Sequence, residues 1–208
     1  QSELYQSSRG IWEYVLDHNN HSWVAWDQLS SYDFQTGDIK DGQREAAEAY
    51  EITTGRNFYA DAVLGVALTN LDKGYTAGME LLEQSRQLNP YQPYFLTRLA
   101  INYENHGEKD RALDELRNGL NLMPDNPTLN VAMGEFSGSE GDYQEALEDF
   151  DKALEYKPLD LKCMFDDCIA LEKLGRNQDA LEECRKMLDL YPDDPEAKIL
   201  YTTLLAKQ

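Results

Sequence analysis

The chain has 208 residues, of which 41% are hydrophobic and 28% charged, a composition that allows a continuous globular core. Asp and Glu number 39 against 19 Lys and Arg, which gives a formal net charge of −20. Because nucleic acids and anionic lipid surfaces are bound through basic patches, this balance excludes both as expected partners. No run of about 18 apolar residues is present, so no membrane-spanning segment is predicted.

The first predicted element is a helix over residues 2–18. Val15 and Leu16 follow Trp12 by three and four residues, which places them on one apolar face. A polar stretch then interrupts this pattern and predicts a turn. Residues 1–22 are therefore expected to form an N-terminal helix and turn.

A pattern of glycine, then an Ala-Leu pair, then a closing proline recurs every 34 residues without insertion. Its positions are Gly107, Ala112 and Pro124, then Gly141, Ala146 and Pro158, then Gly175, Ala180 and Pro192. A fixed period of this length indicates a repeat array, in which each helix pair buries its apolar face only by stacking on a neighbour. Small residues at the alanine positions are expected to let the paired helices approach closely.

The 34-residue register predicts an all-α solenoid of about five helix-turn-helix repeats with a capping helix at its C-terminal end. The predicted segments are a degenerate repeat at 23–58, regular repeats at 59–92, 93–126, 127–160 and 161–194, which together span 23–194, and a capping helix at 195–208. In the degenerate copy Gly42 stands in the alanine position and Thr54 in the proline position. The turn inside the second repeat is expected at Asp72-Lys73-Gly74.

These positions resemble the tetratricopeptide repeat family, whose 34-residue pattern contains W-x2-L-G-x2-Y, A-x3-F and a closing proline. The matching residues are Trp26, Leu29, Tyr103, Gly134, Ala146, Phe150 and the prolines at 90, 124, 158 and 192. The resemblance covers residues 23–208 and is closest over 93–194. It implies a helical scaffold that mediates protein–protein interaction through a concave groove.

Side chains at the second, fifth, ninth and twelfth places of each repeat are expected to line that groove. The predicted ligand groove comprises Val63, Tyr94, Ile101, Glu104, Val131, Glu135, Phe165, Ile169 and Glu172. The apolar members are expected to anchor a partner, and the three glutamates to receive Lys or Arg side chains. The predicted partner is therefore a protein or peptide segment of basic and amphipathic character.

Family members that grip the terminal carboxylate of a peptide carry Lys at the fifth place and Asn at the ninth. The corresponding pairs here include Thr97 with Ile101 and Phe165 with Ile169, and no repeat matches. An adaptor for chaperone tails is therefore not expected.

The motifs of the chain predict no enzyme. The sequence has no phosphate-binding glycine loop with lysine, no H-E-x-x-H and no G-x-S-x-G. Cys163, Cys168 and Cys184 match no zinc spacing and are expected to be buried free thiols. No catalytic residue, metal ligand or cofactor is predicted.

A second resemblance concerns the junction in which Ile11-Trp12 and Val15-Leu16 precede Ala25-Trp26. It is similar to the entry into the repeat region of membrane proteins with an O-mannosyltransferase-like domain, whose repeats lie outside the cytoplasm. It implies an alternative function as an accessory extracytoplasmic domain of a membrane-bound glycosyltransferase-like protein, with catalysis elsewhere. Because the chain does not begin with Met, it is expected to be an excised or processed form. The sequence does not predict the compartment of the protein. Self-association through exposed solenoid ends is a further alternative.

Overall fold

Left-handed glycines end the first helix of several helix pairs. At Gly141, where φ is 90°, the amide donates to the carbonyl oxygen of Gly138 at 3.1 Å. The next amide, that of Asp142, donates to the carbonyl oxygen of Ser137 at 2.9 Å. The same two bonds recur around Gly37, Gly107 and Gly175, whose φ angles are 88°, 78° and 75°. Because glycine adopts this conformation without steric strain, these residues fix where each helix ends.

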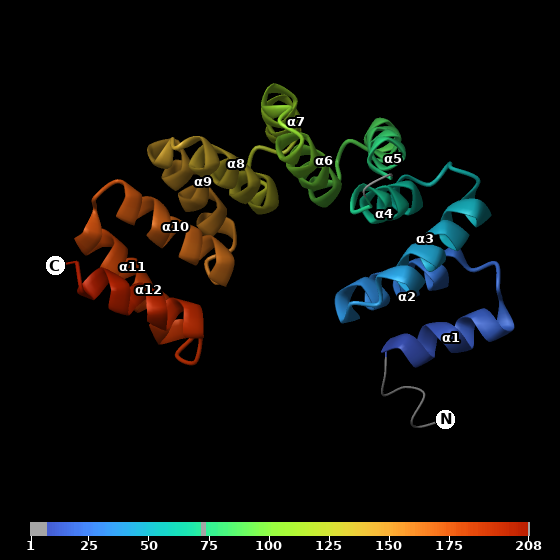
Figure 1. Ribbon diagram of the computed structural model, residues 1–208, viewed down its shortest axis with the longest axis horizontal. Helices are drawn as coiled ribbons and strands as arrows, with labels where there is room; N and C mark the ends of the chain where they lie inside the picture. Colours follow the sequence, from blue (N-terminus) through green and yellow to red (C-terminus); the bar gives the residue numbers. More distant parts are fainter. Residues whose placement is uncertain (1–7, 72–73, 208) are drawn as a thin grey trace. The chain divides into compact units, whose positions relative to one another are not determined.

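The computed structural model describes residues 8–71 and 74–207, and its helices are labelled in Figure 1. All regular secondary structure in this described part is α-helical, in twelve helices. They are α1 (Ser8–His18), α2 (Trp23–Thr36), α3 (Ile39–Thr53), α4 (Phe58–Thr69), α5 (Tyr75–Leu88), α6 (Pro93–Asn105), α7 (Lys109–Leu122), α8 (Pro127–Glu140), α9 (Tyr143–Tyr156), α10 (Leu161–Lys173), α11 (Asn177–Leu190) and α12 (Pro195–Leu205). The predicted all-α architecture is confirmed. Residues 2–7 of the expected first helix, and Asp72 and Lys73 of an expected turn, lie outside the described residues.

The chain forms two compact units, unit 1 (Gln1–Asn102) and unit 2 (Tyr103–Gln208), so that the boundary falls within α6. In unit 1, α2 packs with α3 and α4 with α5, while α1 lies against α2. In unit 2, α8 packs with α9 and α10 with α11, while α12 lies against α11. Each unit therefore contains two complete helix pairs and an end helix, while the boundary divides α6 and places α7 in unit 2.

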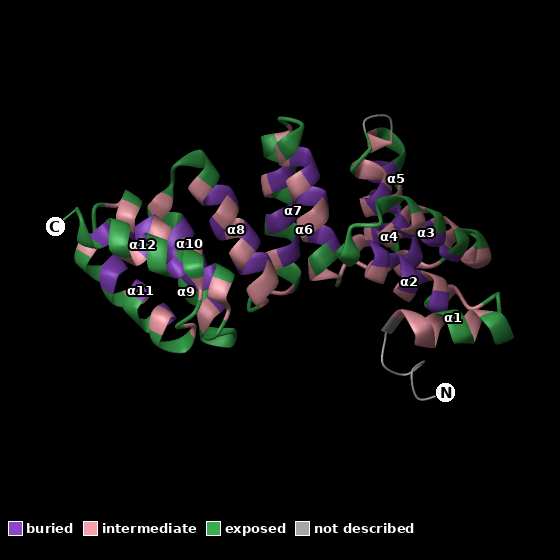
Figure 2. Ribbon diagram, turned by 60° about the horizontal axis from the view of Figure 1, so that its bottom comes forward, coloured by how far each residue is buried: buried purple, intermediate pink, exposed green. Residues whose placement is uncertain are grey.

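The alanines of unit 2 that the sequence predicts at helix contacts are buried. Ala112, Ala146 and Ala180 are each 0% exposed. The three cysteines are also 0% exposed and free, as expected for small apolar side chains in a core. Figure 2 shows the buried residues as purple bands along the helices.

A charged cluster joins α1 to the first helix pair of unit 1. Arg9 forms ion pairs with Asp33 and, at 3.9 Å, with Glu45, two carboxylates that are 0% and 2% exposed. Arg44 also reaches Glu45, at 3.5 Å. Burial, and then the neighbouring Asp33, raise the pKa of Glu45 to about 7. The cationic side chain of Arg9 therefore offsets part of the cost of burying two carboxylates together.

Replacing either of two glycines of α8 by alanine should have opposite effects on stability. A Cβ atom at Gly134 would lie 2.6 Å from the buried ring of Phe150, whereas one at Gly138 would meet nothing closer than 3.9 Å. Gly134→Ala should therefore destabilise unit 2 by about 1–3 kcal/mol through overpacking. Gly138→Ala should be neutral or stabilise it by about 0.5–1 kcal/mol, because alanine favours the helix. Chemical denaturation of both variants measures the difference, and equal stabilities would contradict the packing of α8 on α9.

Candidate functional site

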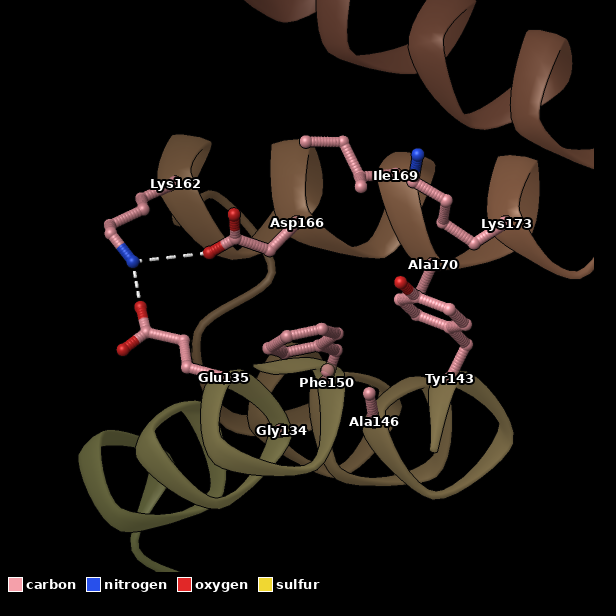
Figure 3. A pocket seen from close by; sticks show the side chains of 11 residues that line it. Gly134, Glu135, Tyr143, Ala146, Phe150, Lys162, Asp166, Ile169, Ala170 and Lys173 are labelled. Carbon is pink, nitrogen blue, oxygen red and sulfur yellow. Dashed lines mark hydrogen bonds and ion pairs between the residues drawn. The ribbon is translucent and has the colours of Figure 1, made fainter. Parts of the chain in front are cut away.

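A hollow of about 400 Å³ opens between α8, α9 and α10 of unit 2 (Figure 3). Its lining residues are Gly134, Glu135, Gly138, Tyr143, Ala146, Phe150, Lys162, Asp166, Ile169, Ala170 and Lys173. Phe150 and Ala146 of α9 form an apolar floor, and Gly138 leaves the space above that floor open. We call this site the unit 2 hollow.

Charged side chains form the rim of the unit 2 hollow. Lys162 of α10 pairs with Glu135 of α8 and, at 3.1 Å, with Asp166 of its own helix, as Figure 3 shows. Lys173, three turns along α10, is exposed and forms no ion pair among the described residues. An apolar floor with a charged rim is the usual arrangement of a surface that binds an amphipathic segment.

A second hollow, of about 520 Å³, lies on the first helices of the unit 1 pairs. Its lining residues are Ser31, Phe34, Gln35, Ile39, Tyr59, Val63, Val66, Ala67, Asn70, Tyr94, Phe95 and Arg98. The buried ring of Phe95 makes edge contacts with Tyr59 and Tyr94, at centroid distances of 5.4 and 5.3 Å. These contacts hold the aromatic walls in place, and we call this site the unit 1 hollow.

The predicted groove residues divide between the hollows and the core. Val63 and Tyr94 line the unit 1 hollow, and Glu135 and Ile169 line the unit 2 hollow. Val131 and Phe165 are partly buried and pack against the core cluster of unit 2. Ile101, Glu104 and Glu172 line neither of these hollows.

The three glutamates expected to receive a cationic partner already have partners within the chain. Glu104 accepts a hydrogen bond from the Ser139 hydroxyl at 2.6 Å. Glu135 pairs with Lys162, and Glu172 pairs with Lys207. A basic ligand would therefore have to compete with these internal contacts rather than meet free carboxylates.

Sequence reasoning missed several lining residues. Arg98 follows Tyr94 by four residues and Lys173 follows Ile169 by four, so each lies one helical turn beyond a predicted groove position. That spacing could have identified both. Ile39, the first residue of α3, also lines the unit 1 hollow. The groove pattern was predicted from the first helices alone, so it could not identify a residue of a second helix.

Three buried aspartates lie outside both hollows. Asp27, Asp61 and Asp167 are 1%, 0% and 4% exposed. Burial raises the pKa of Asp27 to about 6, and burial followed by the charges of Asp151 and Glu183 raises that of Asp167 to about 7. The pKa of Asp61 is also raised by burial. None of the three is among the residues that line either hollow.

These raised pKa values predict a protein that is more stable in mild acid. An aspartate in the unfolded chain titrates near pH 3.9, so between about pH 4 and 7 the folded state binds more protons than the unfolded state. The resulting stability is present at the acidic end of this window and is lost as the pH rises through the folded pKa values. Thermal unfolding should therefore show a higher midpoint at pH 5 than at pH 8.

Asp167→Asn should flatten this pH dependence, because the amide does not titrate. The matched control is Asp189→Asn, which removes an exposed carboxylate from the same unit. A wild-type midpoint that rises from pH 5 to pH 8 would contradict the raised pKa values of these aspartates in the folded protein.

Within the described ranges, no group of three or more His, Cys, Asp or Glu side chains is placed to hold a metal ion. None of the helices described there combines the length and the apolar character needed to cross a bilayer.

The helix pairs, the 34-residue turn spacing and the open hollows define a helical-repeat protein of the tetratricopeptide class. Residues 139–207 match the family model described as tetratricopeptide repeat. This match identifies residues 139–207 as tetratricopeptide repeats, a family that typically mediates protein–protein interactions and is generally non-catalytic.

Curated relatives agree with this assignment. The chain is 29% identical over 86 residues to small glutamine-rich tetratricopeptide repeat-containing protein 2 of Mycosarcoma maydis, a match that covers 41% of this chain and 24% of the relative. It is 24% identical over 142 residues to general transcription factor 3C polypeptide 3 of Homo sapiens, which covers 68% of this chain and 16% of that protein. The chain therefore spans less than a quarter of the length of these two relatives.

Solved structures show the same fold. The chain resembles one from the APC/C hetero-tetramer Cut9-Hcn1 with a TM-score of 0.78 at 17% identity, over 100% of this chain and 40% of that one. It also resembles YrrB, a tetratricopeptide repeat protein with an unusual peptide-binding site, with a TM-score of 0.55 at 16% identity over 89% and 95%. At these identities the two likenesses show the fold alone.

Proposed function

We propose that the chain is a non-enzymatic scaffold that binds a segment of a partner protein in its concave hollows. The observation that carries this proposal is the unit 2 hollow, a space of about 400 Å³ with a charged rim above an apolar floor. YrrB has a peptide-binding site, and Cut9-Hcn1 is a hetero-tetramer of two proteins, so the fold has precedents for such binding.

The floor of the unit 2 hollow suits an apolar anchor. Gly138 provides no side chain, and Phe150, Ala146 and Ile169 surround the space above it. A volume of about 400 Å³ accommodates a few side chains of a bound segment. Burial of an aliphatic or aromatic side chain there would supply most of the affinity, since such anchors commonly cost at least about 2 kcal/mol when truncated.

The rim favours a basic and amphipathic partner for unit 2. Glu135 and Asp166 together hold the single cation of Lys162, whose side chain is 67% exposed. An exposed ion pair contributes little stability, so a Lys or Arg of the partner can exchange with Lys162 at low cost.

The alternative role, as an accessory domain of a membrane-bound glycosyltransferase-like protein, stays a prediction drawn from residues 11–26.

Gly138→Leu should block the unit 2 hollow without unfolding the protein. The added side chain would enter the open space above Phe150, where a Cβ atom meets nothing closer than 3.9 Å. Basic peptides selected on the wild type from a random display library should bind this variant at least about tenfold more weakly, because their anchor has lost its space. Fluorescence anisotropy measures the affinity, and thermal unfolding checks the fold.

Gln144→Leu is the matched control, since it adds the same side chain at an exposed position of α9 outside the hollow. Lys162→Met frees Glu135 and Asp166 and should strengthen the binding of peptides that carry Lys or Arg. If Gly138→Leu and Gln144→Leu bind all selected peptides equally well, the unit 2 hollow is not the binding site.

A further inference from the structure

The unit 1 hollow has an unusual charge for this chain. Acidic residues outnumber basic ones 39 to 19 over the sequence, yet no Asp or Glu is among the described residues that line this hollow. The one charged residue in that described lining is Arg98 of α6. Arg98 is therefore a cation in a lining without described carboxylates, on a protein whose net charge is −20.

Several arginines of the chain have carboxylate partners, and Arg98 differs from them. Arg9, Arg44 and Arg176 each pair with a carboxylate, at distances such as 2.6 Å for Arg44 with Asp41 and 2.7 Å for Arg176 with Asp179. Among the described residues no carboxylate pairs with Arg98, and its Nε–H is buried without a hydrogen-bond acceptor there. A buried donor without an acceptor costs free energy, which an incoming carboxylate would recover.

Aromatic and aliphatic side chains surround this cation. Phe34 of α2, Tyr59 and Val63 of α4, and Tyr94 of α6 line the hollow, and Tyr94 is 58% exposed. The exposed amide of Asn70 at the end of α4 offers both donors and acceptors for the main chain of an extended segment. The walls therefore suit a bulky apolar side chain placed next to a negative charge.

We propose that the unit 1 hollow binds an internal segment of a partner protein in which an Asp or Glu adjoins an aromatic or large aliphatic residue. The carboxylate pairs with Arg98, and the apolar side chain packs among Phe34, Tyr59 and Val63. This inference rests on the proposed function of the concave hollows and specifies the partner chemistry of unit 1. For unit 1, the inferred partner is acidic, whereas the sequence predicts a basic one.

The net charge gives this mode of binding a distinct salt dependence. An acidic segment is repelled at long range by a protein of charge −20, and salt screens that repulsion beyond about 10 Å. The contact with Arg98 acts at short range and is partly desolvated, so salt weakens it less. The association rate should therefore rise with ionic strength, whereas that of a basic segment would fall.

The test selects peptides from a random display library on the Gly138→Leu variant, in which the unit 2 hollow is blocked. Selected sequences should be enriched in Asp or Glu beside Phe, Tyr, Trp or Leu. Amide-capped, fluorescein-labelled peptides from this selection are then measured by anisotropy in three versions, with the acidic residue kept, replaced by its amide, or replaced by lysine. The acidic version should bind at least about tenfold more tightly than the other two.

Arg98→Gln should weaken the binding of the acidic peptide by a similar factor. The affinity for the amide version of this peptide should stay unchanged. Arg56→Gln is the matched control, because it removes an exposed arginine of unit 1 outside the hollow. Tyr94→Ala provides a second variant at an exposed side chain, in case Arg98→Gln alters the fold, and it should weaken all three versions.

Several outcomes would overturn the inference. The first is a library that yields no binder or only basic peptides. The second is an acidic peptide that binds wild type and Arg98→Gln equally well. The third is binding that requires a free chain terminus of the peptide. The proposed binding in the unit 2 hollow fails separately, when basic peptides selected on the wild type bind Gly138→Leu as well as they bind Gln144→Leu. If Gly138→Leu blocks binding and Arg98→Gln does not, the scaffold function stands and the acidic segment is wrong.

Discussion

The close approach of paired helices is the contact on which the rest of each unit depends. In unit 2 it occurs at Ala146 and at Gly134, where even a Cβ atom would meet the ring of Phe150 at 2.6 Å. In unit 1 the backbones of α4 and α5 approach so closely that a Cβ at Gly65 would lie 2.9 Å from the carbonyl oxygen of Gly78. Contacts this tight require the helices to begin and end at fixed positions. Left-handed glycines such as Gly141 supply that control, because the chain reverses there without strain.

The hollows follow from the same packing. In unit 2 the first helices of two successive pairs, α8 and α10, lie on either side of the hollow, and the intervening second helix α9 forms its floor. Phe150 occupies this floor in unit 2 because Gly134 makes room for its ring. Electrostatics then distinguish the two sites, since Lys162 is shared by two carboxylates whereas Arg98 has none among the described residues. One architecture thus presents two hollows whose linings differ in charge.

The sequence predicted the features that repeat and missed those that depend on tertiary contacts. Gly141, Ala146 and the 34-residue period identify turns, contact points and fold because the same local requirement recurs in each copy. Groove positions were predicted from helical spacing, which found Tyr94 but not Arg98 one turn later. Ion pairs such as that of Lys207 with Glu172 join residues 35 positions apart, and no local pattern specifies them. The division into two compact units within α6 likewise has no marker in a continuous register.

The most direct test of binding in the concave hollows is an NMR chemical-shift map of the protein with a peptide selected from the random library. The largest shifts should fall on residues that line the hollows, such as Gly138 and Ile169 in unit 2 and Val63 in unit 1. Residues exposed on the second helices, such as Gln144, should shift little. Shifts concentrated on α9 and α11 away from the hollows, with Gly138 and Val63 unchanged, would contradict the claim that the concave hollows bind the partner.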